Sequence, residues 1–136
     1  MTDERFMRRA LELARRAREE GEVPIGAVVV LDQKIIGEGW NRPIAASDPT
    51  AHAEIQAMRA DSLSQWNYRL TGATLYVSLE PCDMCIGAMF HARIARAVYG
   101  ATDPKKQVLK NQVVLQGGVL ADECGALLSK FFAAKR

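Results

Sequence analysis

The sequence has little cysteine and no strong excess of charge of either sign. It contains three cysteines in 136 residues, and 18 Lys and Arg stand against 16 Asp and Glu. An odd number of cysteines in a reducing compartment argues against a disulfide framework and favours a metal-binding or catalytic role for the close pair Cys82 and Cys85. The formal net charge of +2 does not by itself require a nucleic-acid partner.

Long apolar runs are also missing. No run is long enough to cross a bilayer, and residues 1–9 are too charged for a secretory signal. We therefore expect no membrane association and a cytoplasmic location. The chain has neither internal repeats nor low-complexity linkers, and 49% of its residues are hydrophobic. Its length is typical of one domain, so we predict a single domain over residues 1–136.

Hydrophobic periodicity predicts alternating helices and strands, with a hairpin near the start. Residues 39–49 and 103–112 are expected to be loops, and Thr50 is expected to cap the second helix. We predict helices at 3–20, 51–63, 81–92 and 120–133, and strands at 27–31, 35–38, 73–78, 96–100 and 113–116. This order predicts an α/β fold with a mixed sheet between layers of helices.

Two short motifs suggest a metal site, and each stands at the start of a predicted helix. One is His52-Ala53-Glu54, and the other runs from Pro81 to Cys85. Cysteines three positions apart on one helical turn can face one metal ion, and the helix N-terminus favours their thiolate forms. With His52 they form a set of three zinc ligands that leaves the fourth position for water, which is the catalytic arrangement.

The chemistry expected of such a site is hydrolytic deamination. Zinc lowers the pKa of a bound water toward about 7, which makes a zinc-bound hydroxide available for attack. Glu54 is suited to shuttle the proton to a ring nitrogen and then to the departing ammonia. The pattern His-x-Glu with Pro-Cys-x-x-Cys is that of zinc-dependent nucleobase deaminases.

Other interpretations of these residues remain open at this stage. The Cys-x-x-Cys pair alone also suits a redox dithiol or half of a structural zinc site, although neither explains Glu54. Cys124 and His91 are the other obvious candidates for a fourth ligand. Cys124 lies among leucines in a predicted helix and fits a buried packing role, and His91 is also expected to pack.

Five longer stretches resemble the bacterial tRNA-specific adenosine deaminase family, within the cytidine deaminase-like superfamily. They lie at residues 22–27, 37–42, 48–54, 79–85 and 120–124. The resemblance implies a three-layer α-β-α fold with a five-stranded mixed sheet, a homodimer, and conversion of adenosine to inosine at the wobble position of a tRNA anticodon loop.

The resemblance also implies roles for individual residues. It assigns zinc to His52, Cys82 and Cys85 and the proton shuttle to Glu54. Asn41 matches a residue that hydrogen-bonds the flipped-out base, although an Asn in a loop is also a common turn residue. Ile25 and Leu79 match apolar residues that sandwich the base, although composition alone would place both in the core. Asp103 and Phe132 match positions near the bound strand.

One segment departs from the family. The connection at residues 104–112 is roughly a dozen residues shorter than usual in the family, which is nearer an ordinary loop length. Lys105, Lys106 and Lys110 remain there as candidate phosphate contacts. The alternatives are an engineered or altered member that deaminates adenine or cytosine in single-stranded DNA, a free-base guanine or cytosine deaminase, and a zinc-stabilised binding module that has no need of Glu54.

Overall fold

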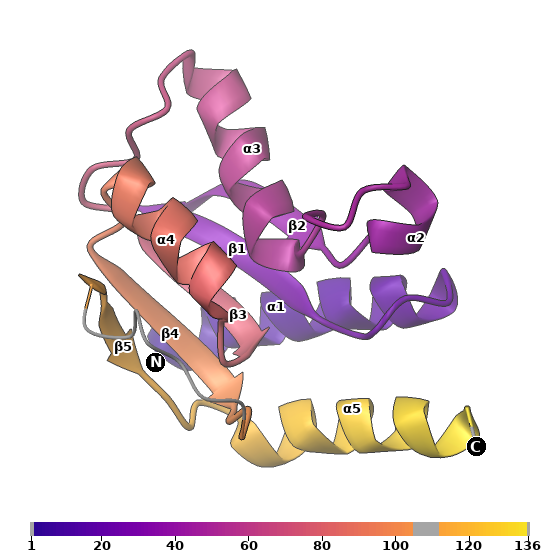
Figure 1. The fold of residues 1–136 in the computed structure, drawn as a ribbon. Coiled ribbons are helices and arrows are strands. Elements are labelled where there is room, and N and C mark those ends of the chain that lie inside the picture. The colour runs from indigo at the N-terminus through magenta and orange to yellow at the C-terminus, as the bar shows by residue number, and fades with distance from the viewer. Residues whose placement is uncertain (1, 105–111, 136) are drawn as a thin grey trace.

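The protein folds around one central sheet with helices on both faces (Figure 1). The computed structural model describes residues 2–104 and 112–135. The helices are α1 (Thr2–Glu19), α2 (Pro43–Ala46), α3 (Ala53–Gln65), α4 (Asp83–Ala92) and α5 (Ala121–Ala134). The strands are β1 (Gly26–Leu31), β2 (Lys34–Trp40), β3 (Thr74–Leu79), β4 (Arg96–Ala101) and β5 (Val114–Gln116).

The sheet is mixed, as predicted, with the strand order β2-β1-β3-β4-β5. β1 runs antiparallel to both β2 and β3, whereas the β3–β4 and β4–β5 pairs are parallel. The predicted hairpin is present, because Leu31 pairs with Lys34 across a turn made by Asp32 and Gln33. In the parallel part of the sheet, the carboxyl ends of β3 and β4 lie at the same edge, where loops commonly form sites.

The side chains of the central strands alternate between two separate cores. On one face, Val29, Leu75 and Val77 pack beneath α3 and α4. On the other face, Val28 and Val98 pack against α1 and α5. Because both faces are covered, these strands are apolar at nearly every position rather than at alternate ones. The predicted three-layer α-β-α architecture is confirmed.

Two glycines in β2 allow α3 to approach the sheet closely. A Cβ atom added at Gly39 would lie 2.4 Å from the backbone nitrogen of Ala57, and one at Gly37 would lie 2.4 Å from the carbonyl oxygen of the same residue. Only glycine fits at such a distance. The close packing fixes the height of α3 over the sheet and therefore the position of the residues at its start.

Three local predictions require correction. Residues 39–49 are not entirely loop, since β2 continues to Trp40 and the short helix α2 follows. Thr50 does not cap a helix: α3 begins three residues later, and the Thr50 hydroxyl donates to Asp48 instead. Likewise α4 begins at Asp83, two residues after Pro81. At Thr50 a turn contact with Asp48 outweighs the local helix-start pattern, and the two-residue difference at α4 is of the size by which helix ends ordinarily vary.

Most of the predicted loop at residues 103–112 lies outside the described residues, and Lys105, Lys106 and Lys110 lie outside them too. Among the helices that the structure does describe, none has the length and apolar character needed to span a membrane.

Candidate active site

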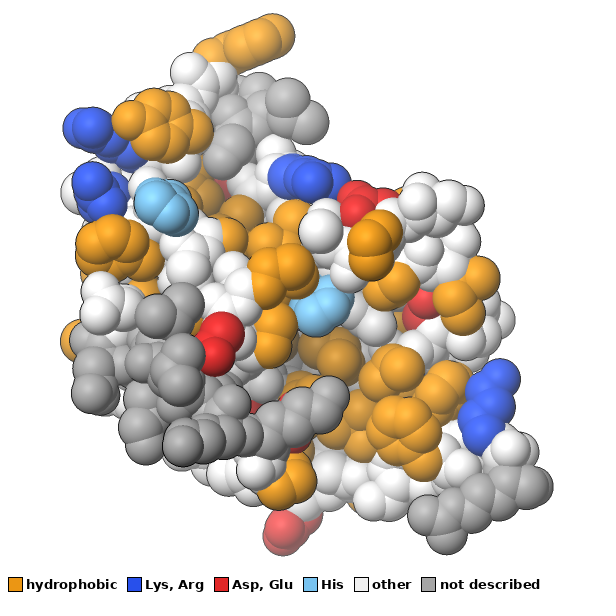
Figure 2. Space-filling model, viewed as in Figure 1, with side chains coloured by type: hydrophobic (Ala, Val, Ile, Leu, Met, Phe, Trp, Pro, Cys, Tyr) orange, Lys and Arg blue, Asp and Glu red, His pale blue; other side chains and the backbone are white. Residues whose placement is uncertain are grey.

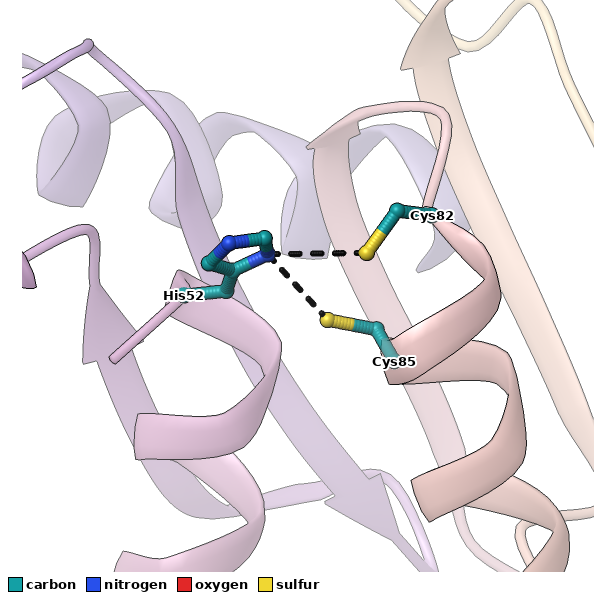
Figure 3. A group of neighbouring side chains, drawn as sticks. All are labelled: His52, Cys82 and Cys85. Carbon is teal, nitrogen blue, oxygen red and sulfur yellow. Dashed lines mark hydrogen bonds between the residues drawn. The ribbon is translucent and has the colours of Figure 1, made fainter. Parts of the chain in front are cut away.

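The three predicted metal ligands come together at the starts of two helices on the same face of the sheet. His52 directly precedes α3, Cys82 is the N-cap residue of α4, and Cys85 lies in its first turn. Figure 3 shows both sulfur atoms directed at one edge of the imidazole ring, where each Sγ lies 3.6 Å from Nδ1 of His52. Cys82 and Cys85 are 30 and 33 positions from His52 in the sequence. Their proximity to His52 therefore depends on how α3 and α4 pack.

The spacing of these atoms suits zinc. Tetrahedral zinc with ordinary Zn–S and Zn–N bond lengths places sulfur and nitrogen ligands about 3.6 Å apart. All three candidate ligand atoms lie within 4.8 Å of one another. Cys85 is buried, whereas His52 and Cys82 are partly exposed. The residues thus fit a zinc ion with three protein ligands and one open side.

The two thiols influence each other strongly. A hydrogen bond from Cys85, together with contacts to His52, lowers the pKa of Cys82 to about 4. The same hydrogen bond and deeper burial raise the pKa of Cys85. One thiol of the pair therefore ionises readily and the second resists, because the hydrogen bond between the two sulfur atoms stabilises one thiolate at the expense of the other.

Glu54 lies beside this group, at the start of α3 and in the lining of a cavity. Its side chain is buried, and burial raises its pKa to about 7, with the charge of Cys82 contributing in the same direction. A carboxyl group that titrates near neutral pH can both accept and donate a proton under physiological conditions. Glu54 is thus placed and tuned for acid–base chemistry next to the three candidate ligands.

A cavity of about 460 Å³ opens beside these residues and collects most of the predicted site. Asn41 is buried in its wall, and Phe132 lies half-exposed at its border. In Figure 2 hydrophobic side chains surround a histidine side chain on this face. The predicted residues that line the cavity are Ile25, Asn41, His52, Glu54, Leu79, Cys82, Asp103 and Phe132.

The remaining predicted residue, Cys85, lies behind the cavity wall and is fully buried. Cys124 packs in the core beneath α1 and α5, as expected, and its Sγ fills the space above Gly100. His91 is exposed, and its ring packs edge-on against Phe90. Neither Cys124 nor His91 belongs to the ligand group found among the described residues.

Several cavity residues were not singled out from the sequence. Val23 and Glu80 lie within stretches that carried the family resemblance, so the resemblance held the signal for them. No sequence motif pointed to the other three cavity residues, Thr102, Pro104 and Leu128. Their position in the fold, after β4 or in α5, is what brings them to the cavity. Glu80 accepts a hydrogen bond from the backbone N–H of Asp103 at 2.9 Å and so holds that part of the wall.

Comparison with known proteins agrees with this site. The family described as the cytidine and deoxycytidylate deaminase zinc-binding region matches residues 1–101. Fold and site together therefore define a zinc-dependent deaminase.

A tRNA-specific adenosine deaminase of Haemophilus influenzae is 50% identical over 147 aligned positions, which cover 98% of this chain and 85% of the relative. A solved structure from studies of A-to-I editing by tRNA:A34 deaminases at the wobble position of transfer RNA has a TM-score of 0.86 and 41% identity, covering 91% of this chain and 99% of that one. The chain belongs to the tRNA-specific adenosine deaminases within the cytidine and deoxycytidylate deaminase family.

A second branch of the same fold is also similar. The structure of guanine deaminase from Nitrosomonas europaea has a TM-score of 0.87 at 25% identity and covers 96% of this chain and 84% of that one. Guanine deaminase from Bacillus subtilis is 42% identical, but its structure has a TM-score of 0.69 and covers 73% of this chain and 64% of that one. The tRNA deaminase structure matches a larger share of both chains than this Bacillus structure does, with a higher TM-score, and this distinguishes the two branches. The 147 aligned positions with the Haemophilus relative exceed the 136 residues of the chain, so that relative carries residues which this chain lacks.

Proposed function

We propose that this chain hydrolyses adenosine to inosine at the wobble position of a tRNA anticodon loop and releases ammonia. The observation that carries the proposal is the shared cavity, which is lined by the candidate zinc ligands His52 and Cys82, by Glu54 and by Asn41. A tRNA substrate is found in the cytoplasm, so a cytoplasmic location accompanies this function.

His52, Cys82 and Cys85 are the proposed ligands of zinc. When bound, zinc acidifies a water molecule so that a nucleophile is available at neutral pH. The thiolate form of Cys82 is already favoured, and α4 directs the positive end of its dipole toward both sulfur atoms. The chain therefore prepares the charge that the cation needs before it binds.

Glu54 is the proposed proton carrier. Its carboxylate accepts a proton from the attacking water and passes it to a ring nitrogen of the purine, and a second transfer converts the exocyclic amine into ammonia. Its raised pKa supports this cycle, because a carboxylate with an ordinary pKa would be too weak a base to accept the proton of the water efficiently.

Asn41, Ile25 and Leu79 are the proposed contacts to the base. The Asn41 amide offers a donor and an acceptor to the ring edge, and its backbone is held by a hydrogen bond to the carbonyl of Ile25. Ile25 and Leu79 are only partly buried, so each retains apolar surface toward the cavity. Apolar walls with a few polar groups are typical of sites that bind a flipped-out base.

The border of the cavity favours a base that is attached to a strand over a free base. Thr102, Pro104 and Phe132 are exposed there, and Asp103 lies between two of them. An exposed aromatic ring at the mouth of a site can stack on a neighbouring base. We assign Asp103 and Phe132 to contacts with the strand on either side of the target nucleotide.

The direct test is product analysis after incubation with a tRNA anticodon stem-loop, single-stranded DNA, guanine and cytosine. We expect inosine from the wobble adenosine of the stem-loop and no turnover of guanine. Glu54→Gln is the matched control, since it keeps the shape of the side chain and removes the carboxylate. Xanthine formation from guanine without inosine in the RNA would contradict the proposal and support the guanine deaminase branch.

A preference for unstructured strands is the second candidate, and the residues absent relative to the Haemophilus protein favour it. We infer that a shorter connection at residues 104–112 removes contacts to a folded stem, since an unpaired base costs little to flip. The measurement is the ratio of kcat/KM for a stem-loop and an unstructured oligonucleotide, with and without a family-length loop inserted. An unchanged ratio would exclude this role for the segment.

A homodimer is also part of the proposal. Apolar side chains remain exposed on α4 and on the segment that follows α3: Tyr68, three residues beyond α3, is 66% exposed, and Met84 and Phe90 on α4 are 39% and 44% exposed. A shallow depression of about 300 Å³ lies between the two helices, bordered by Met58, Ala88 and Ala92 among others. Exposed apolar surface of this kind suits a second copy of the chain.

Light scattering coupled to size-exclusion chromatography tests the dimer. We expect a mass of two chains for the wild type and of one chain for a Tyr68→Glu, Phe90→Glu double variant. The matched control is Ile44→Glu, which adds a charge at an exposed apolar residue of α2, away from α3 and α4. A monomeric wild type with full activity would contradict the proposal.

A further inference from the structure

Residues 42–51, here called the 42–51 loop, connect two residues of the cavity wall that have different proposed roles. Asn41, the proposed base contact, directly precedes it, and His52, the proposed zinc ligand, directly follows it. The loop closes on itself, because the N–H of Arg42 donates to the carbonyl of Ala51 at 2.9 Å. The Asn41 N–H is also held from outside the loop, by the carbonyl of Ile25 at 3.0 Å. Together with this bond, the conformation of the loop sets how the Asn41 amide and the His52 ring are placed relative to each other.

The two ends of the loop are held in different ways. On the His52 side, the His52 carbonyl accepts the N–H of Gln56 at 3.0 Å, so the residue is continuous with α3. The part of the loop just before His52 is held by hydrogen bonds within the loop, since Asp48 accepts both the N–H and the hydroxyl of Thr50. On the Asn41 side, α2 has no side-chain cap of its own at Arg42.

Glu22, which lies outside the loop, supplies the hydrogen-bond acceptors for the first turn of α2. Its carboxylate accepts the N–H of Ala45 at 2.8 Å and the N–H of Ile44 at 3.2 Å, across 23 and 22 residues of sequence. These N–H groups belong to the first turn of α2, where no earlier helical carbonyl can accept them. Each of the two carboxylate oxygens takes one of them, so both are used.

The burial of Glu22 indicates that this contact is specific. The residue is 2% exposed, although a buried carboxylate loses its hydration. Among the described residues, its recorded side-chain contacts are these two backbone N–H groups, and no Lys or Arg side chain pairs with it. Its own N–H donates to the carbonyl of Ala17 at the end of α1, which anchors Glu22 to the rigid helix.

We propose that Glu22 is a positioning residue, which holds the first turn of α2 and thereby fixes the Asn41 amide over the cavity. This rests on the base-contacting function proposed for Asn41. Because His52 is held by α3 and not by Glu22, loss of the carboxylate moves Asn41 and leaves the zinc ligands in place. Misplacing one orienting group by about 1 Å commonly lowers the rate by about 10- to 100-fold.

The first test is a double-mutant cycle with Glu22→Gln and Asn41→Ala in the zinc-loaded protein. Glutamine keeps the shape and one acceptor oxygen, but its amino group cannot accept the second N–H. We expect Glu22→Gln to lower kcat/KM by about 10- to 100-fold in the wild-type background and by less than about 3-fold in the Asn41→Ala background. Equal effects in both backgrounds would overturn the proposal.

Controls separate positioning from general damage. Glu19→Gln makes the same substitution at an exposed residue at the end of α1 and should leave kcat/KM unchanged. Zinc content should stay at one ion per chain in Glu22→Gln, and a loss of zinc would overturn the proposal. If Glu22→Gln does not fold, Glu22→Asp serves in its place, since it keeps the charge but is too short to reach both N–H groups.

Amide hydrogen exchange gives a reading that does not depend on activity. In Glu22→Gln we expect faster exchange at Ile44 and Ala45 and unchanged exchange in α3. Unchanged exchange at these two amides would overturn the role of Glu22. The kinetic cycle uses whichever substrate the wild type turns over, so failure to act on tRNA would contradict the proposed function and still allow this role to be judged.

Discussion

The two ends of the sheet shift the pKa values of acidic groups in opposite directions. Beyond the carboxyl ends of β3 and β4, Glu54 is buried beside two cysteines, and burial raises its pKa to about 7. At the opposite end, the hydrogen bond from Arg96, joined by one from Tyr76, lowers the pKa of Asp3. The Asp3 carboxylate receives the Tyr76 hydroxyl at 2.6 Å and Arg96 at 3.0 Å.

The difference shows which end is arranged for stability and which for chemistry. At the far end, α1 is joined to β3 and β4 by the Asp3 carboxylate, which accepts hydrogen bonds from the Tyr76 hydroxyl and the Arg96 guanidinium. The negative charge of Asp3 is therefore matched by the positive charge of Arg96. The cavity end gathers two thiols, an imidazole and a carboxyl group without a cationic side chain among them. Groups with perturbed pKa values in a cleft are characteristic of functional sites. A zinc ion held by the proposed ligands would add a positive charge at this end.

The largest expected effect is at the zinc ligands. Cys85→Ala removes one of three ligands, so we expect most of the zinc to be lost and activity to fall below detection. Metal analysis by mass spectrometry after extensive dialysis measures the stoichiometry. Cys124→Ala is the control, because its sulfur lies in the other core and should leave zinc content unchanged. Unchanged zinc in Cys85→Ala would show that the ligand assignment is wrong.

The second largest effect is expected at Glu54, also at the cavity end of the sheet, where a substitution tests proton transfer separately from zinc binding. Glu54→Gln should keep the fold and one zinc ion per chain and lose about 10³-fold in rate, since the amide cannot carry the proton. Single-turnover kinetics and metal analysis on the same sample measure both quantities. Turnover within a few-fold of the wild type would sink the proton-shuttle mechanism.

At the stabilising end the expected effect is smaller and depends on pH. Asp3→Asn should lower the free energy of unfolding by about 1 kcal/mol at pH 7, because the contact is partly exposed and screened by solvent. The folded pKa of Asp3 is lowered, so its stabilisation is present above the unfolded value of about 3.9 and disappears as pH falls through the folded value.

Urea unfolding of the two proteins between pH 2 and 7 checks this prediction. The difference between wild type and Asp3→Asn should be constant from pH 5 to 7 and shrink below about pH 4. Activity of the zinc-loaded protein should not change, because the contact lies at the far end of the sheet. A difference that grows on acidification would contradict the assigned sign.

The smallest effect concerns the turn between β1 and β2. Asp32 and Gln33 both have positive φ, 51° and 65°, which is typical of a type I′ hairpin turn. Because Gln avoids this backbone region and Gly does not, Gln33→Gly should raise the free energy of unfolding by about 0.5 kcal/mol. Thermal unfolding measures it, and Lys34→Gly, one residue further on, should destabilise instead.

Much of the fold and the site could be predicted from local patterns. Hydrophobic periodicity reports which face of each element is buried. It was sufficient to predict the hairpin, the mixed sheet and the four longer helices α1, α3, α4 and α5. His52, Glu54, Cys82 and Cys85 were identified because zinc chemistry restricts both residue type and spacing within a helical turn. The base and strand contacts depended on the family resemblance.

Tertiary structure alone decided the contacts that join distant parts of the chain. α2 was missed because its four residues are held by Glu22, more than twenty positions away, rather than by a cap of their own. Thr50 was misassigned because Asp48 competes for its hydroxyl. The pairing of Asp3 with Tyr76 spans 73 residues. Sequence periodicity records burial along one element, whereas a hydrogen bond between elements depends on how they pack, and only the folded chain determines that.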